Sequence, residues 1–336
     1  GRYELDNIKS YTEIYGKKVF FLIDVFFYAS MKEKFEQLYA GSESTIQCEQ
    51  FGGQCTEDEI LRCTAMAKDL TPDVVVGIGG GKTMDTAKAV ADNYGAYTVI
   101  VPTTASTDAP AMGLSVVYTA EGEHIGARHY KKNPDLVLLD TDIIAKAPIR
   151  FLVAGMGDAL ATYFEARACV TKGAGTCAGG LATEAAYALA KLCYDTLMEE
   201  GVKAKIALDA GACTKAVEKV IEANTLLSGI GFESCGLAGA HAIHNGLTVL
   251  PECHHMYHGE KVAFGTLAQL ALENVPADEL EEIIGFCVEV GLPVTLKGLG
   301  IEDITDEKIM AVAEAACAEN DTLHNMPFQV TAESVA

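Results

Sequence analysis

The sequence predicts an N-terminal α/β domain with a parallel, doubly wound sheet, followed by a helical C-terminal domain. Three valines at 74–76 lead into a glycine-rich turn and then a helical pattern. Other short apolar runs have the pattern of strands in such a sheet: residues 17–24, 97–102 and 136–140. From residue 150 onward the sequence is rich in alanine and has few strand patterns. We therefore expect two domains, residues 1–149 and 150–336, as the chain length also favours.

The charge balance narrows the possible partners. The chain has 47 acidic and 25 basic residues, a formal net charge of −22, and no long run of lysine or arginine. Because nucleic acids and anionic membrane surfaces are bound through clustered basic residues, both are disfavoured as partners.

The cysteines and the apolar runs indicate the cellular compartment of the protein. The 11 cysteines include no C-x-x-C pair, a usage that favours reduced thiols inside a cell. No apolar run is long enough to span a membrane, and the N-terminus lacks the pattern of a signal peptide. We expect a cytoplasmic protein. The chain starts at Gly1 without Met and stops at Ala336 within a helical pattern, so we expect that either end could be incomplete.

The glycine-rich turn is the first candidate site. Four glycines follow the valine strand and precede a helical pattern over residues 83–91: Gly77, Gly79, Gly80 and Gly81. A strand, a bare turn and a helix N-terminus aim unpaired N–H groups at one point, which suits a phosphate. The spacing fits neither the P-loop, which needs glycine at Val76, nor the dinucleotide fingerprint, which needs glycine at Lys82. We interpret the turn as a nucleotide site; the alternative is a turn that only connects two elements.

Polar residues follow two of the other predicted strands. Asp24 ends the strand at 17–24, where an acid can accept hydrogen bonds from a ribose and favour NAD over NADP. The alternative for Asp24 is an ordinary solvated loop residue. The loop after the strand at 97–102 is placed to meet a ligand, unless it is simply a hydroxyl-rich turn. Its candidate residues are Thr103, Thr104, Ser106 and Asp108.

The remaining patterns of the first half are structural. Residues 57–70 have a helical pattern, and residues 114–119 and 124–130 can form a β-hairpin around the turn at 121–123. The strand at 136–140 closes this half, which ends near Pro148.

In the second half, three polar residues share one helical face. Asp158, Thr162 and Glu165 are spaced at i, i+4 and i+7. Asp158 stands at the start of the predicted helix, so an N-cap is its alternative reading. Residues 224–246 carry glycines along a helical pattern, which permit close helix approach or a break, and an apolar helix is expected at 262–272.

Histidines cluster between residues 241 and 258. Five of the eight in the chain fall here: His241, His244, His254, His255 and His258. Imidazoles beside carboxylates suggest a divalent metal, and three protein ligands plus an open position are typical of catalytic zinc. The alternative for each histidine alone is a satisfied surface or core residue, and the spacing does not choose the ligands.

Long motifs resemble the glycerol dehydrogenase branch of the iron-containing (group III) alcohol dehydrogenase family. They include GIGGGKTMDTAKAVAD, VPTTASTDAP, YKKNPDLVLLDT, GDALATYFEAR, GLAGAHAIHNGL and HGEKVAFGTLAQLALE, and the likeness covers nearly the whole chain. The resemblance implies a Rossmann-like N-terminal domain and an all-helical C-terminal domain, as in dehydroquinate synthase-like folds. It also implies that NAD and a metal meet between them, and a homo-oligomer, commonly an octamer.

The resemblance assigns roles residue by residue. It implies NAD contacts at Asp24, Gly80, Gly81, Lys82, Asp85, Thr103, Thr104, Ser106, Leu114 and Tyr118. Asp108 would meet a polyol, and Asp158, His241 and His258 would hold the metal and complete the catalytic set. Iron-type relatives carry a histidine where this chain has Thr162, so one oxygen and two nitrogen ligands fit one Zn²⁺ per subunit.

The implied reaction is the NAD-dependent oxidation of glycerol to dihydroxyacetone and its reverse, by metal-assisted hydride transfer. Another vicinal diol or hydroxyketone, such as 1,2-propanediol, is the alternative substrate. A phosphorylated substrate would need a basic cluster near the metal, where the sequence offers Lys261, and a non-catalytic binding protein is the remaining alternative. The chain departs from the family pattern at Met112, where a small polar residue is common. The resemblance also implies a C-terminal helix after Ala336, so we expect that the chain is truncated there or lacks this part for another reason.

Overall fold

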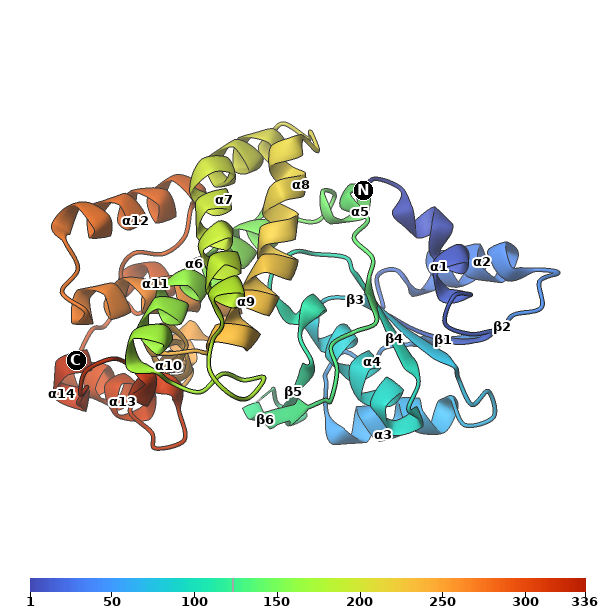
Figure 1. Ribbon diagram of the computed structural model, residues 1–336, viewed down its shortest axis with the longest axis horizontal. Coiled ribbons are helices and arrows are strands. Elements are labelled where there is room, and N and C mark those ends of the chain that lie inside the picture. The colour runs from blue at the N-terminus through green and yellow to red at the C-terminus, as the bar shows by residue number, and fades with distance from the viewer. Residues whose placement is uncertain (123) are drawn as a thin grey trace. The chain divides into compact units, whose positions relative to one another are not determined.

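A computed structural model describes residues 1–122 and 124–336 of the chain (Figure 1). The chain forms two compact units: Gly1–Thr104 with Ala109–Ala147, and Ala105–Asp108 with Pro148–Ala336. The short segment Ala105–Asp108 therefore groups with the second unit although it follows a strand of the first. Among the described helices, none combines the length and the apolar character needed to cross a membrane.

The first unit contains the strands. In chain order its elements are the 3₁₀ helix Glu4–Asn7, α1 Ile8–Thr12, β1 Lys18–Ile23, α2 Tyr28–Tyr39, β2 Thr45–Gln50, α3 Glu57–Met66, β3 Val74–Gly79, α4 Gly81–Tyr94, β4 Tyr97–Pro102, the 3₁₀ helix Ala109–Ala111, β5 Leu114–Tyr118, β6 His124–His129, β7 Leu136–Val137 and α5 Thr141–Ile144. The strands β2-β1-β3-β4-β7 form a parallel sheet in that order.

Both faces of this sheet are buried, as predicted for a doubly wound sheet. Phe21 and Val76 point to the face covered by α2, where they pack in one core with Phe35. Their neighbours along the strands, Phe20 and Val75, point to the other face and pack with residues of α3 and α4. Because successive side chains of a strand alternate between faces, a strand covered on both sides must be apolar at every position.

The strand order has a topological switch point between β1 and β3. The chain leaves β1 for β2 on one side and then crosses to β3 on the other side, so the connections diverge at the carboxyl ends of β1 and β3. In parallel sheets such a switch point is where ligands bind. Asp24 directly follows β1, and Gly80 lies between β3 and α4.

Two predicted elements of the first unit differ in extent. The helix predicted at residues 83–91 runs from Gly81 to Tyr94, and the strand predicted at residues 136–140 covers only Leu136–Val137. The strand is shorter because Asp140 caps α5, accepting hydrogen bonds from the backbone N–H groups of Asp142 and Ile143 at 3.0 and 3.4 Å. The predicted hairpin is confirmed by the antiparallel pair β5–β6, while Glu123 of its predicted turn lies outside the described residues.

The second unit is helical. Its elements are α6 Ile149–Lys172, α7 Glu184–Asp209, α8 Lys215–Glu222, a π-helix Ala223–Leu227, α9 Ser228–Cys235, α10 Gly239–Leu247, the 3₁₀ helix Pro251–Cys253, α11 His258–Leu272, α12 Ala277–Val290, the 3₁₀ helix Lys297–Leu299, α13 Asp306–Ala316, the 3₁₀ helix Thr322–Asn325 and α14 Ala332–Val335. The pattern at residues 224–246 is broken at Gly236, whose φ of 103° favours glycine. The helix expected at residue 262 already begins at His258.

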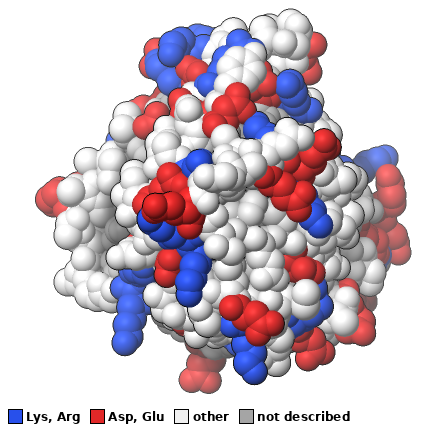
Figure 2. Space-filling model, turned by 90° about the vertical axis from the view of Figure 1, so that its right-hand side faces the viewer, with Lys and Arg blue, Asp and Glu red and all other residues white. Residues whose placement is uncertain are grey.

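The surface carries both signs of charge. On the face seen in Figure 2, basic and acidic side chains are interspersed rather than gathered by sign. Such mixing keeps a strongly acidic chain from presenting a uniform field on that face.

Candidate metal centre and nucleotide site

Three helices of the second unit approach one another through glycines. A Cβ on Gly259 of α11 would lie 1.8 Å from the carbonyl oxygen of Ala154 on α6, and a Cβ on Gly265 would lie 2.3 Å from that of Ala240 on α10. Only a residue without a side chain permits backbones to pack this closely. The glycines therefore bring α6, α10 and α11 together at the point where each carries a polar side chain.

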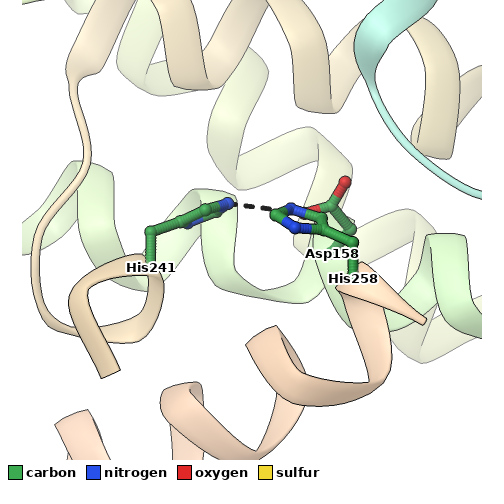
Figure 3. A group of neighbouring side chains, drawn as sticks. All are labelled: Asp158, His241 and His258. Carbon is green, nitrogen blue, oxygen red and sulfur yellow. Dashed lines mark ion pairs between the residues drawn. The ribbon is translucent and has the colours of Figure 1, made fainter. Parts of the chain in front are cut away.

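Asp158, His241 and His258 converge there, one from each helix (Figure 3). Oδ1 of Asp158 lies 3.1 Å from Nε2 of His258 and 3.5 Å from Nε2 of His241. One potential ligand atom from each residue lies within 4.8 Å of the others, a spacing that suits a metal ion. The N-cap reading of Asp158 is wrong, because Asp158 lies in the interior of α6 rather than at its start.

The Asp158 carboxylate has the environment of a metal ligand. Asp158 is 1% exposed, and neither oxygen accepts a well-oriented hydrogen bond from the residues that the structure describes. Burial alone would raise the pKa of Asp158, but the nearby imidazoles of His258 and His241 lower it below its usual range. A buried carboxylate without donors is costly, and a cation held between it and two imidazoles would remove that cost. The residues present therefore fit a divalent metal.

Glu165 orients one of the imidazoles. Its Oε2 lies 2.6 Å from Nδ1 of His241, and its Oε1 accepts the backbone N–H groups of Ala238 and His241 at 2.8 and 2.9 Å. When the ring is neutral with its proton on Nδ1, the Nε2 lone pair on the side of Asp158 is available to a metal. Burial alone would lower the pKa of His241, but Glu165 and Asp158 outweigh it and raise that pKa well above its usual value.

The other three clustered histidines do not join this group. His244 lies behind His258, with its Nε2 3.0 Å from Nδ1 of His258. Nε2 of His254 faces the carbonyl oxygen of Thr248 at 3.0 Å, and His255 packs beside Gly300. Two of the five clustered histidines therefore reach Asp158, and the sequence spacing did not distinguish them.

A second chain of polar groups leads to Asp108. Oγ1 of Thr162, one helical turn after Asp158 on α6, lies 2.9 Å from Oγ of Ser228. Ser228 in turn donates to Oδ2 of Asp108 at 3.0 Å. Burial, with the negative charge of Asp158, raises the pKa of Asp108 to about 8. Asp108 is thus held by Ser228 in a buried position near the charge of Asp158.

The first unit holds the candidate nucleotide site. Gly80 is the N-cap of α4 and offers no side chain to accept the first N–H groups of the helix. A Cβ added to Gly80 would meet nothing within 4 Å, so this helix start is open. Gly79 lies close to both Thr83 and Asp24, because its added Cβ would stand 2.6 Å from Oγ1 of Thr83 and 3.0 Å from Cβ of Asp24. The open N–H groups and the positive end of the helix dipole can bind a phosphate.

Lys82 and Asp85, in the first turns of α4, differ in how accessible their side chains are to a ligand. Lys82 is exposed, with its ammonium 5.3 Å from the ring centre of Tyr118. Asp85 is buried: its carboxylate pairs with Lys88 at 2.9 Å and accepts the N–H of Val116 at 3.0 Å. Asp85 thus fastens α4 to β5, the strand that carries Tyr118.

The other residues that the sequence placed near NAD lie in the loop after β4 and at the start of β5. Thr103 is buried and donates its backbone N–H to Gly79, while Thr104 and Ser106 are half-buried. Leu114 and Met112 are buried. Ser106, like Asp108, belongs to the segment that groups with the second unit.

The sequence singled out Glu165 and His244 but did not predict their contacts with His241 and His258. Ser228 and Asp321 were missed, because their contacts join segments far apart in the sequence.

Comparisons with known proteins agree with this fold. The sequence profile of the iron-containing alcohol dehydrogenases matches residues 1–141. The glycerol dehydrogenase of Citrobacter freundii is 57% identical over 329 residues, 96% of this chain and 90% of that protein. The glycolaldehyde reductase of Halobacterium salinarum is 51% identical over 281 residues, 84% of this chain and 77% of that protein. A crystal structure of a probable glycerol dehydrogenase from Sinorhizobium meliloti 1021 aligns with a TM-score of 0.94 at 48% identity, covering 99% of this chain and 92% of that one.

These likenesses extend over both units, far beyond the matched profile. The chain belongs to the iron-containing alcohol dehydrogenase family. Within that family it is similar to glycerol dehydrogenases over nearly its whole length.

Proposed function

We propose that this chain oxidises glycerol to dihydroxyacetone with NAD as hydride acceptor, and catalyses the reverse reaction. Relatives named glycerol dehydrogenase, at 57% identity and over 96% of the chain, support the assignment. The observation that carries the chemistry is the convergence of Asp158, His241 and His258, with both Asp158 oxygens buried and accepting no hydrogen bond among the described residues.

In this proposal Asp158, His241 and His258 hold one Zn²⁺ per subunit. One oxygen and two nitrogen ligands suit zinc, and Thr162, already engaged with Ser228, replaces the additional histidine of iron-type relatives. A bound divalent ion would supply charge stabilisation to an alcohol that loses its proton. The protein's own part is to orient the imidazoles through hydrogen bonds such as that from His241 to Glu165.

Asp108 is proposed to contact a hydroxyl group of the polyol. It is 7% exposed and is held by Ser228, so its carboxyl is fixed rather than mobile. A fixed carboxyl offers two oxygens that can accept hydrogen bonds from neighbouring hydroxyl groups of a substrate. Such a pair of contacts would distinguish a diol from a simple alcohol.

NAD is proposed to bind the first unit at the switch point of the sheet. The open start of α4, at Gly80 and Gly81, would take the pyrophosphate, and Asp24 would accept hydrogen bonds from the ribose hydroxyls. The remaining proposed contacts are Lys82, Asp85, Thr103, Thr104, Ser106, Leu114 and Tyr118. Because both Asp85 oxygens are engaged by Lys88 and Val116, Asp85 would act by holding β5 and Tyr118 in place.

The assembly and location of the protein are also proposals. The family resemblance implies a homo-oligomer, an octamer by analogy, and the composition favours the cytoplasm. Sedimentation of the purified protein would test the proposed homo-oligomer, because a monomer would contradict it.

Absorbance of NADH tests the proposed reaction directly. Wild-type protein with NAD and glycerol should produce NADH, and dihydroxyacetone should consume it. Asp158→Asn should lose turnover while keeping its circular dichroism spectrum, because one charged ligand is replaced by a neutral amide. Asp278→Asn, in the first turn of α12, is a matched control that should keep wild-type turnover. Full activity of Asp158→Asn would contradict the proposed metal site.

A second substrate class is favoured by one observation. The Halobacterium salinarum relative, at 51% identity, is named for the reduction of glycolaldehyde, a hydroxyaldehyde. Comparing kcat/KM for glycerol, 1,2-propanediol, dihydroxyacetone and glycolaldehyde would rank the two classes. A large preference for glycolaldehyde over dihydroxyacetone would replace the glycerol assignment.

A further inference from the structure

A line of hydrogen-bonded groups extends from His258 away from the proposed metal centre. Nδ1 of His258 lies 3.0 Å from Nε2 of His244, and Nδ1 of His244 lies 3.0 Å from Oδ1 of Asn245. The Asn245 amide nitrogen then donates to Oδ2 of Asp321 at 2.9 Å. The line joins α11, α10 and the segment just before the 3₁₀ helix Thr322–Asn325.

The chemistry of the last group sets the direction of every bond. A carboxylate only accepts, so Asn245 must turn its NH₂ group to Asp321 and its oxygen to His244. Nδ1 of His244 must then carry the proton, which leaves its Nε2 as an acceptor. Nδ1 of His258 therefore donates, and in the neutral imidazole this leaves the lone pair on Nε2, 3.1 Å from Oδ1 of Asp158, available to a metal.

Asp321 is held in this role by its own surroundings. Its other oxygen, Oδ1, accepts the backbone N–H of Thr322 at 2.7 Å, so the carboxylate caps the 3₁₀ helix that follows. Thr322 is tied to the start of α10 through a hydrogen bond from its hydroxyl to Ala238 at 2.7 Å. His244 is 9% exposed, so it has little water with which to replace a lost partner.

We propose that His244, Asn245 and Asp321 are positioning residues that hold the His258 imidazole in the tautomer and orientation needed to bind a divalent metal. The inference rests on the proposed metal centre and adds to it a second support, separate from Glu165, which holds His241. The three residues act through His258 and do not touch the metal or the substrate.

Zinc affinity, measured by competition with a chromophoric chelator, tests this inference without reference to turnover. His244→Phe keeps a ring of similar size without an acceptor and should weaken zinc binding by about 10- to 100-fold. His244→Gln restores an acceptor oxygen and should bring the affinity back toward the wild-type value. His254→Phe, four residues before His258 but exposed, is the matched control and should leave the affinity unchanged.

A double-mutant cycle separates positioning from general support of the fold. Asn245→Leu and Asp321→Leu should each weaken zinc binding in the wild-type background, and neither should weaken it further once His244→Phe is present. Equal effects in both backgrounds would overturn the inference, as would wild-type affinity in His244→Phe. The visible spectrum of the Co²⁺-substituted variants gives a second measure of ligand geometry, and spectra identical to wild type would also count against it.

The experiment distinguishes this inference from the function it rests on. If wild-type protein binds zinc and Asp158→Asn does not, the metal centre stands, and the His244 variants then decide the inference alone. If zinc binding does not depend on Asp158, the proposed centre fails and the inference fails with it.

Discussion

At the scale of single residues, Ser228 shows how a buried side chain can control a substrate contact. It donates to Asp108 and lies next to Thr162, so it joins the proposed polyol-binding residue to α6, the helix of Asp158. Ser228 is fully buried. Its removal would leave the buried Asp108 carboxyl without this donor.

We predict that Ser228→Ala reduces kcat/KM for glycerol. Leaving a buried polar group without its hydrogen-bond partner costs about 1–3 kcal/mol, which corresponds to roughly 5- to 150-fold in kcat/KM. Steady-state kinetics with glycerol would measure the change. Ser10→Ala, at an exposed serine that contacts only its own turn in the described chain, is the control and should behave as wild type. Unchanged kinetics in Ser228→Ala would show that Asp108 does not need this contact.

The sequence predicted the residues of the proposed centre only in part. The histidine cluster indicated a metal, and the family resemblance selected Asp158, His241 and His258, which the structure brings together. Spacing alone did not exclude His244, because His241 and His244 lie one helical turn apart and both approach His258. Which histidine faces Asp158 depends on how α10 and α11 pack, and no local pattern encodes that.

At the scale of elements, glycines decide where the ligand-bearing helices meet. Gly157 and Gly259 face each other across α6 and α11, since a Cβ on Gly157 would lie 2.3 Å from the carbonyl oxygen of Gly259. Each glycine stands next to a proposed ligand, Asp158 or His258. The close packing therefore places the two ligands side by side.

We predict that Gly259→Ala destabilises the helical unit and weakens zinc binding. The added methyl group would require α6 and α11 to separate, and overpacking of this kind costs about 1–3 kcal/mol. Gly285→Ala on α12 is the matched control, because a Cβ there meets nothing within 4 Å. That control should stabilise the helix by up to about 1 kcal/mol. Calorimetry would compare the two variants, and an unfolding temperature of Gly259→Ala equal to wild type would refute the prediction.

Element types were predictable where the sequence pattern was long or fully apolar. The valine run of β3 and the run of β1 gave strands buried on both faces, and the glycine turn gave the start of α4. The predicted strand at β7 was too long, because the apolar run continued to Asp140. Asp140 instead caps α5, and its capping hydrogen bonds cannot be recognised from an apolar periodicity. The π-helix Ala223–Leu227 continues α8 without a break, and its wider hydrogen-bond pattern is not visible in a side-chain periodicity.

At the scale of the whole molecule, the two proposed binding functions belong to different units. The proposed NAD contacts lie mainly in the first unit, and all three proposed metal ligands lie in the second. Binding of the dinucleotide and binding of the metal should therefore be separable, although turnover needs both.

We predict that metal removal abolishes turnover and leaves NADH binding largely intact. Protein treated with a chelator and then freed of it should show wild-type quenching or enhancement of NADH fluorescence, because the open start of α4 needs no metal. Activity should return when Zn²⁺ is added back. Loss of NADH binding together with the metal would show that the two functions are not independent.

The segment Ala105–Asp108 makes the chain pass between the units three times rather than once. A fragment of residues 148–336 would therefore lack part of its own interior. The buried amide of Asn224 would lose the carbonyl oxygen of Ala105 that accepts from it at 2.9 Å, and Ser228 would lose Asp108. The helical half is thus not a module that a single cut in the gene could release, and recombination or fragment expression would have to preserve this four-residue insert.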